Sequence, residues 1–248
     1  MISMTVDPRI FLASNRLSIF KYVVPVLSPK GGVGKSTIAT ALSLVLTDDF
    51  ETVSLLDLDI NNPTTHIILG IDTGSLKIEE DKGILPIKLF GSRLEFMSIA
   101  LFTGDKLVPL RGRDISNAIL EILAITRWSG KVLIVDTPPG FSDEVMDLMR
   151  IQSNIKPLIV STTDKLSLHS ASRLIELLSS EGIDILGIVG NMCKDDDTSI
   201  LETYLQGVDI IACIPKIDGF DKLYGCIDTI YELFKQHLMK VVEVLRTR

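Results

Sequence analysis

The sequence predicts an α/β fold in which a doubly wound, mainly parallel sheet is flanked by helices. Short apolar segments alternate with longer amphipathic segments along most of the 248 residues, and this alternation is typical of parallel strands joined by helical crossovers. The mean hydropathy is high, at +0.35, although the sequence has no stretch of about 18 uncharged apolar residues that could span a membrane. We therefore expect the apolar residues in strands that are covered on both faces.

The predicted strands and helices follow from the hydrophobic periodicity. Strands are expected at residues 23–28, 52–57, 94–98, 132–136, 157–161, 185–190 and 210–214. Helices are expected at residues 36–46, 113–125, 143–152 and 166–180, where apolar residues recur every three or four positions. Residues 61–93 and 99–112 lack a clear period, so we expect loops there, at the sheet edge where open parallel sheets bind ligands.

The totals fit a single domain. The sequence has no internal repeat, and we expect one domain over residues 1–248, with an N-terminal extension at 1–20 and a C-terminal amphipathic helix at 226–248. The 25 basic and 32 acidic residues give a net charge of −7, which argues against a surface made for DNA or RNA, and we expect no sequence-specific nucleic-acid partner. Three widely spaced cysteines form no disulfide framework and fit a reducing cytoplasm, which is the expected location.

The strongest signal is a glycine-rich loop, residues 30–37 (KGGVGKST), between the first predicted strand and the first predicted helix. Because we expect it to bind phosphates, we call it the phosphate loop. Phosphate oxygens need converging backbone N–H groups, which a chain without Cβ atoms and a helix N-terminus both supply. Lys35 would contact the β- and γ-phosphates of ATP, and Ser36 would ligate Mg²⁺. A glycine-rich turn with a chance lysine is the alternative. The predicted nucleotide-binding residues of the loop are Gly31, Gly32, Val33, Gly34, Lys35, Ser36 and Thr37.

Acidic residues end two of the predicted strands. Asp57 and Asp59 are two positions apart, so they would share one face and point toward the phosphates. We predict that Asp59 orients the attacking water and that Asp57 supports Mg²⁺, with capping of the following turn as the alternative for both. Asp136 ends another apolar strand and is expected to hold Mg²⁺ through water, while Gly140 in the loop after it would approach the γ-phosphate.

An extra lysine early in the loop, Lys30, makes the motif resemble the deviant Walker A motif of the MinD/ParA/Mrp group of dimeric P-loop ATPases. In that group the extra lysine reaches across a two-fold interface to the partner's nucleotide. The resemblance implies a nucleotide-gated homodimer in which Lys30 acts in trans, so that Lys30, Lys35 and Asp59 are the expected catalytic residues. A solvent-exposed loop lysine is the alternative.

Further motifs are similar to those of the Mrp/ApbC branch, which includes P-loop ATPases of iron–sulfur cluster assembly. They are residues 136–144 (DTPPGFSDE), residues 57–63 (DLDINNP), which resemble D-A-D-I-x-G-P, and residues 187–192 (GIVGNM), which resemble G-x-V-x-N-M. This resemblance implies that Asn191 pairs with the adenine edge and that Pro215 and its loop cover the base. The alternative for Asn191 is a turn at the exit of a strand.

One feature of that branch is missing. Mrp-type carriers usually have C-x-x-C shortly after the N-M pair, and two such pairs hold one Fe–S cluster between subunits. Here Met192 is followed by Cys193 alone and then by Lys194 and acidic residues, so two copies would offer two thiolates from this position instead of four. An Fe–S cluster therefore has less support than ATP and Mg²⁺, and Cys213 and Cys226 are expected to fill packing positions.

The resemblance implies Mg-dependent binding and slow hydrolysis of ATP in the service of Fe–S cluster assembly or transfer. A MinD/ParA-like positioning ATPase, which binds membrane or DNA surfaces, is one alternative, because the basic amphipathic residues 226–248 would bind a membrane when two copies meet. We expect instead that this helix packs on the sheet. A regulatory ATPase with a protein client is the other alternative.

Overall fold

The computed structural model describes residues 7–104, 106, 110–152, 154–194 and 197–247. Within these residues, eight strands form one sheet in the order β3-β4-β2-β5-β1-β6-β7-β8. Neighbouring strands pair in parallel, except β3 and β4, which pair antiparallel. The strands are β1 (Tyr22–Leu27), β2 (Val53–Asp57), β3 (Ile87–Leu89), β4 (Leu94–Ser98), β5 (Val132–Asp136), β6 (Leu158–Ser161), β7 (Gly187–Cys193) and β8 (Ile210–Pro215).

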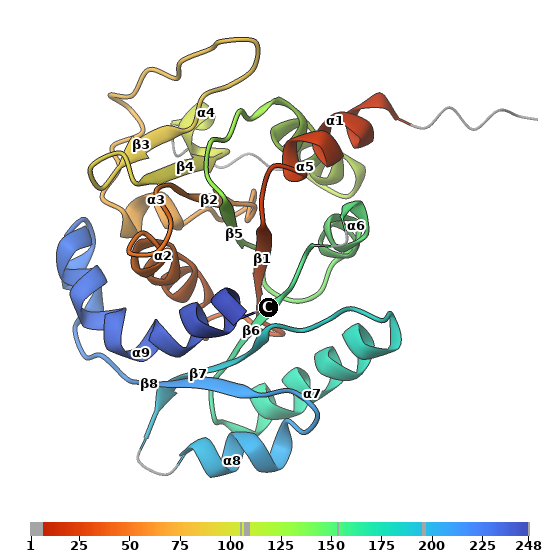
Figure 1. Ribbon diagram of the computed structural model, residues 1–248, viewed down its shortest axis with the longest axis vertical. Helices are drawn as coiled ribbons and strands as arrows, with labels where there is room; N and C mark the ends of the chain where they lie inside the picture. The colour runs from red at the N-terminus through yellow and green to blue at the C-terminus, as the bar shows by residue number, and fades with distance from the viewer. Residues whose placement is uncertain (1–6, 105, 107–109, 153, 195–196, 248) are drawn as a thin grey trace, which may run out of the picture.

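Helices cover both faces of this sheet. In Figure 1, α1, α5, α6 and α7 lie on one face, and α2 and α9 lie on the other, so the central strands are buried along their whole length. The helices are α1 (Pro8–Leu17), α2 (Lys35–Leu46), α3 (Thr65–Ile68), α4 (Ala100–Thr103), α5 (Arg113–Ile125), α6 (Asp143–Ile151), α7 (Lys165–Ser180), α8 (Asp197–Tyr204), the 3₁₀ helix η1 (Phe220–Leu223) and α9 (Ile227–Thr247). The predicted doubly wound α/β fold is confirmed.

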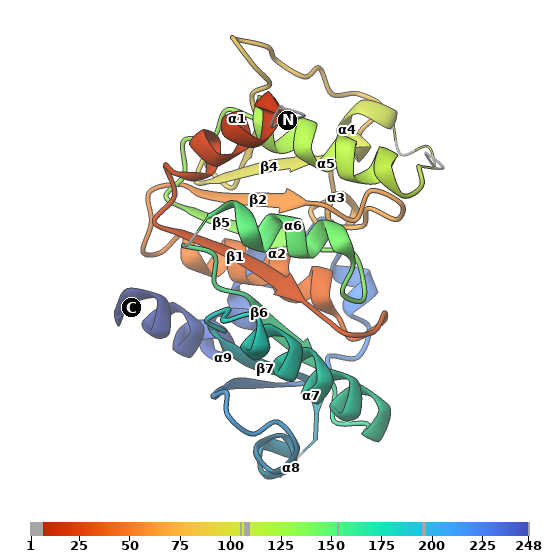
Figure 2. The same cartoon turned by 90° about the vertical axis from the view of Figure 1, so that its right-hand side faces the viewer.

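The strand order reverses beside β1. The chain leaves β1 through α2 toward β2 on one side of the sheet, and it leaves β5 through α6 toward β6 on the other side. In Figure 2, α6 lies in front of the sheet and α2 lies behind it. Loops that leave neighbouring strands in opposite directions open a crevice at the carboxyl ends of the strands, which is where such sheets bind ligands.

Three of the sequence expectations need correction. Residues 61–93 and 99–112 are expected to be loops, but they contain β3, which pairs with β4, and the short helices α3 and α4. Elements of three or four residues are too short to show a period. Helix α1 occupies most of the described part of the N-terminal extension, and the side chain of Asp7 caps it by accepting the N–H of Arg9 at 2.9 Å. Strand β7 continues to Cys193 through an irregularity in its pairing with β8.

Helix α9 packs against α2 and β8, as expected for the C-terminal segment. Its buried side chains recur at helical spacing, so its apolar face is occupied by the protein itself. Among the described residues, no helix combines the length and the apolar character that crossing a membrane requires. The buried side chains of α9 are Ile230, Phe234, Leu238, Val241, Val242 and Leu245.

The cysteines also differ from expectation. Cys193 and Cys213 form a disulfide, although they are 20 residues apart in the sequence. Because β7 and β8 are neighbours in the sheet, their ends bring these two thiols together, and sequence spacing does not reveal such a pairing. Cys226 is exposed, so it does not fill a packing position.

Candidate functional site

A cleft of about 310 Å³ opens beside the loop that follows β1 and leads into α2. The segment after β2, the loop after β5 and the segment before α9 complete its walls. Because β1 lies where the strand order reverses, the cleft occupies the position at which doubly wound sheets bind ligands. Its lining residues are Ser28, Gly31, Gly32, Gly34, Lys35, Ser36, Thr37, Asp59, Asn62, Thr64, Ile67, Ile68, Pro139 and Tyr224.

The loop curls because two of its glycines have left-handed backbone angles, with φ of +81° at Gly32 and +85° at Gly34. A Cβ atom on Gly34 would lie 2.2 Å from Nδ2 of Asn191, so both conformation and space require glycine there. The Asn191 amide donates a hydrogen bond of 2.8 Å to the carbonyl of Val33. Helix α2 begins at Lys35, so the unpaired N–H groups of its first turn lie at the loop.

A buried ion pair adjoins this loop. The side chains of Lys35 and Asp136, which are 7% and 0% exposed, form it. Thr65 Oγ1 donates a hydrogen bond of 3.0 Å to the second carboxylate oxygen of Asp136. A buried charge is strongly unfavourable unless it is paired and hydrogen-bonded, so these three side chains hold one another in place at the wall of the cleft.

The two acids after β2 lie in different environments. Asp57 is buried, and its carboxylate accepts the N–H of Asp59 at 3.0 Å and the N–H of Thr65 at 3.2 Å. Burial, followed by the charge of Asp136, raises the pKa of Asp57 well above its usual range. Asp59 lies beyond the strand and lines the cleft, and burial raises its pKa too. Asp57 is not among the residues that line the cleft, and its carboxylate caps the turn, which is the alternative given for it above.

The extra lysine of the loop lies outside the cleft lining. Lys30 Nζ is 3.2 Å and 3.3 Å from the two carboxylate oxygens of Asp164. Asp164 caps helix α7 by accepting the N–H of Ser167 at 3.1 Å. Hydrogen bonds from Ser167 and Thr162, and then from Lys30, hold the pKa of Asp164 below its usual range. Both members of the ion pair are exposed, so water competes for it.

Some of the other predicted residues line the cleft and some do not. Ser36 and Thr37 line it. Gly140 donates its N–H to the carbonyl of Ser28 at 2.9 Å, so the loop after β5 lies against the start of the phosphate loop, but Pro139 rather than Gly140 lines the cleft. Pro215 ends β8, is exposed, and is not among the lining residues.

Several side chains of the site were not singled out from the sequence, and two of them show why. Thr65 hydrogen-bonds Asp136 from a segment without periodicity. Tyr224 lines the cleft because its neighbour Gly225 donates its N–H to the carbonyl of Ile68 at 3.0 Å. A Cβ atom on Gly70 would lie 2.4 Å from the Gly225 Cα, so the two segments come this close only because both residues are glycine. The sequence shows the two glycines but does not show that they meet.

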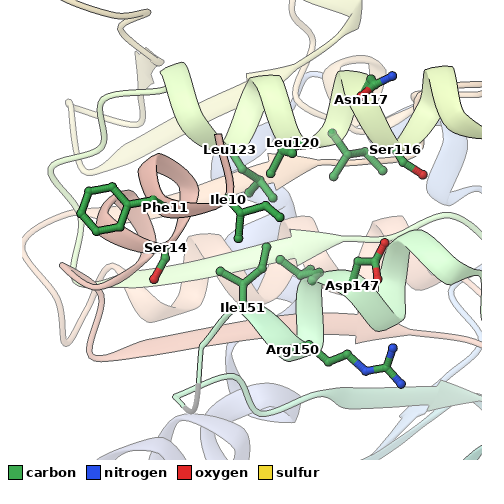
Figure 3. A pocket seen from close by; sticks show the side chains of 12 residues that line it. Ile10, Phe11, Ser14, Ser116, Asn117, Leu120, Leu123, Asp147, Arg150 and Ile151 are labelled. Carbon is green, nitrogen blue, oxygen red and sulfur yellow. The ribbon is translucent and has the colours of Figure 1, made fainter. Parts of the chain in front are cut away.

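A larger groove of about 570 Å³ lies between α1, α5 and α6. Figure 3 shows its apolar walls, with Ile10 and Phe11 on α1, Leu120 on α5, and the two charged side chains Asp147 and Arg150 on α6. Within the described part of the chain, no group of three or more His, Cys, Asp or Glu side chains gathers as a metal site would require. The cleft differs from this groove in that a lysine, a carboxylate and a glycine-rich loop meet there.

Comparison with known proteins identifies the family of the chain. A family model described as ParA: NUBPL iron-transfer P-loop NTPase matches residues 19–201. The chain is 37% identical over 180 residues to the iron–sulfur cluster carrier protein of Pseudomonas fragi, a match that covers 71% of this chain and 62% of the relative. It is 38% identical over 179 residues to a cytosolic Fe-S cluster assembly factor, the Nubp2 homolog of Drosophila pseudoobscura pseudoobscura, with 69% of each chain covered. The chain thus spans less than two thirds of the Pseudomonas relative's length.

Solved structures share the fold at low sequence identity. A nucleotide-binding protein from Archaeoglobus fulgidus in complex with ADP superposes with a TM-score of 0.72 at 24% identity, over 90% of this chain and 93% of that chain. The septum site-determining protein MinD from Pyrococcus horikoshii, complexed with Mg-ADP, superposes with a TM-score of 0.65 at 18% identity, over 90% and 94% of the two chains.

Proposed function

The chain belongs to the ParA family of P-loop NTPases, in the group described as NUBPL iron-transfer P-loop NTPases, and from this premise we propose that it binds ATP with Mg²⁺ and hydrolyses it slowly. The observation that carries the proposal is the buried ion pair of Lys35 and Asp136 beside a loop with left-handed glycines, in a cleft that Asp59 also lines. Converging N–H groups, a cation and carboxylates are the parts that phosphoryl transfer needs.

In this proposal the phosphate loop binds the triphosphate, and Lys35 contacts the β- and γ-phosphates. A triphosphate offers Lys35 anionic oxygens that compete with Asp136, so the ion pair is a resting contact. The Ser36 hydroxyl and the Asp136 carboxylate are oxygen ligands of the kind that Mg²⁺ prefers, and the ion would neutralise charge on the phosphates. Asp57 fits a supporting role only, because its oxygens already accept two backbone N–H groups. Besides Lys35, the loop residues proposed to bind the triphosphate are Gly31, Gly32, Val33, Gly34, Ser36 and Thr37. Gly140 would approach the γ-phosphate from the loop after β5.

Asp59 is proposed to orient the attacking water. It lines the cleft, and it accepts the N–H of Asn62 at 3.2 Å, which fixes one of its oxygens. The raised pKa that burial gives Asp59 makes its carboxylate a better proton acceptor. Asn191, already hydrogen-bonded to the loop, is proposed to pair with the adenine edge, with Pro215 in the loop that covers the base.

Two copies are proposed to meet around their nucleotides as a homodimer, with Lys30 acting in trans. In the single chain Lys30 is paired with the exposed Asp164. Because an exposed ion pair contributes at most about 1 kcal/mol to stability, Lys30 can leave Asp164 and bind another anion. Lys30→Ala should leave ADP affinity within about threefold and lower both turnover and ATP-dependent dimer formation by roughly tenfold or more. Asp164→Asn, as the matched variant, should raise dimer formation up to about fivefold. Full turnover in Lys30→Ala would overturn the trans role.

The client of this ATPase is proposed to be an Fe–S cluster or an apoprotein that receives one, in the cytoplasm. The names of the Pseudomonas and Drosophila relatives, and the family description, support this. Because Cys193 is bonded to Cys213 in the structure, the test is anaerobic reconstitution of the reduced chain with iron and sulfide. About two iron atoms per chain, lost in Cys193→Ser, would correspond to a four-iron cluster per dimer. Iron at background would instead direct the search to a protein client.

The deciding experiment for the ATPase itself is calorimetric titration of the purified chain with ATP, with and without Mg²⁺, followed by measurement of phosphate release. We expect binding that strengthens with Mg²⁺ and slow turnover. Ser36→Ala should keep most of the Mg-free binding and lose the strengthening by Mg²⁺, because the hydroxyl ligand is gone. Absence of ATP and ADP binding in the folded wild-type chain would overturn the proposal.

A further inference from the structure

The disulfide between Cys193 and Cys213 lies at the carboxyl ends of β7 and β8, next to the strand position that contacts the phosphate loop. Both sulfur atoms lie over Gly190. A Cβ atom at that position would be 2.9 Å from Cys193 Sγ and 3.2 Å from Cys213 Sγ, and 2.4 Å from Leu201 Cδ1 of α8. Glycine is therefore needed at position 190 for the sulfurs and for the helix that packs over them.

The chain between the disulfide and the cleft is strained. Met192 has a φ of +57°, a left-handed conformation that costs free energy for a residue with a long side chain. It stands at the irregular pairing of β7 with β8, between Asn191 and Cys193. Each neighbour is fixed by a different contact, Asn191 by the carbonyl of Val33 at 2.8 Å and Cys193 by the bond to Cys213. The strained residue is thus held from both sides.

We propose that Cys193 and Cys213 form a reversible dithiol–disulfide site that reacts with small-molecule disulfides and tightens nucleotide binding when the bond is closed. The inference rests on the proposed nucleotide binding at the cleft. With the bond closed, Cys193 keeps Met192 left-handed and Asn191 on the phosphate loop. With the bond open, Met192 relaxes, Asn191 leaves the Val33 carbonyl, and the loop loses one of its supports.

The exchange balances with a disulfide such as oxidised glutathione as the oxidant. Cys213 is half-buried and Cys193 is 8% exposed, so the Cys213 thiolate attacks the small disulfide first, forming a mixed disulfide and releasing one thiol. The Cys193 thiolate then attacks the Cys213 sulfur and releases the second thiol. Two protein thiols lose two protons and two electrons, and the oxidant becomes two thiols. In a cytoplasmic protein, disulfides of this kind are usually transient.

The test uses the full chain equilibrated with mixtures of reduced and oxidised glutathione. Thiol titration in denaturant should fall from three thiols per chain to one, which is the free Cys226. Fluorescence titration with a fluorescent ADP analogue should show roughly tenfold tighter binding in the oxidised protein, from the strain that reduction releases. Cys213→Ser and Cys213→Ala should bind with the weaker affinity in both buffers. Cys226→Ser, the matched control, should keep the full difference.

Two results would overturn the inference. A thiol count that stays at three in oxidising buffer would show that the bond does not close. A count that falls to one without tighter binding would show that the bond is structural and is not coupled to the cleft. Failure of the proposed nucleotide binding has a different signature, since the ADP analogue would then bind in neither buffer and in none of the variants, and the coupling would fall with it.

Discussion

The cleft beside the phosphate loop has about 310 Å³, and the groove between α1, α5 and α6 has about 570 Å³. The smaller space receives groups from four separate segments: the loop after β1, the segment after β2, the loop after β5 and the segment before α9. The larger space is a seam between three helices, with apolar side chains along its walls (Figure 3). Volume and apolar character therefore favour the groove, whereas the convergence of polar groups at the carboxyl ends of the strands favours the cleft, which is the candidate site.

The two regions also differ in the burial of their ion pairs, and therefore in how much stability is lost when one partner is removed. In the cleft, Lys35 and Asp136 are buried against each other, so each depends on the other. At the groove, Arg150 is 63% exposed and pairs with Glu181 at 3.3 Å, a contact that water weakens. The cleft is thus a place where single substitutions should have large effects, and the groove is a place where they should not.

Lys35→Ala should have the largest effect, because it removes both the proposed ligand of the phosphates and the counterion of Asp136. We expect nucleotide affinity to fall by roughly 100-fold or more and the free energy of unfolding to fall by about 3–5 kcal/mol. Titration with an ADP analogue and urea unfolding measure the two effects. Lys35→Ala combined with Asp136→Asn should recover much of the stability and none of the affinity. Arg150→Ala, the control at the groove, should change stability by less than about 0.5 kcal/mol.

Gly34→Ala should have the next largest effect, and Gly32→Ala is its matched control. Both residues are left-handed, so both variants should lose about 1–2 kcal/mol of unfolding free energy from the backbone alone. Only at Gly34 would the new Cβ meet Asn191, which should cost a further ~1–3 kcal/mol through the displaced amide. Urea unfolding of the nucleotide-free proteins separates the two contributions. Equal losses would show that Asn191 moves away freely.

The sequence predicts the regular helices and strands of the fold well. The bounds of β4, β5 and α5 are those that the periodicity predicts, and the strand–loop–helix context of the phosphate loop is present. These features depend on local patterns of apolar residues and glycines, which the chain shows directly. The segments that proved harder are short or irregular, such as β3, whose three residues carry too little pattern.

Contacts between distant segments could not be predicted in the same way. The hydrogen bond from Thr65 to Asp136 and the bond between Cys193 and Cys213 depend on which strands become neighbours and in which register. Asp57 illustrates the limit, because its spacing from Asp59 assumes that the strand continues, whereas β2 ends at Asp57 and the chain turns. Residue types thus led to a hypothesis about the chemistry of the site, while the turn geometry decided which acid lines the cleft.

Phe11→Ser, at the groove, should have the smallest effect of all. The side chain is 68% exposed, so its removal gives up little buried area, and the unfolding free energy should change by less than about 0.5 kcal/mol. Nucleotide affinity should stay unchanged, because α1 contributes no residue to the cleft lining. The internal control is Leu17→Ala on the same helix, where a fully buried side chain should cost about 2–5 kcal/mol. A loss of nucleotide affinity in Phe11→Ser at unchanged stability would contradict the separation of the two regions, since it would show that the groove communicates with the phosphate loop through α6 and the loop after β5.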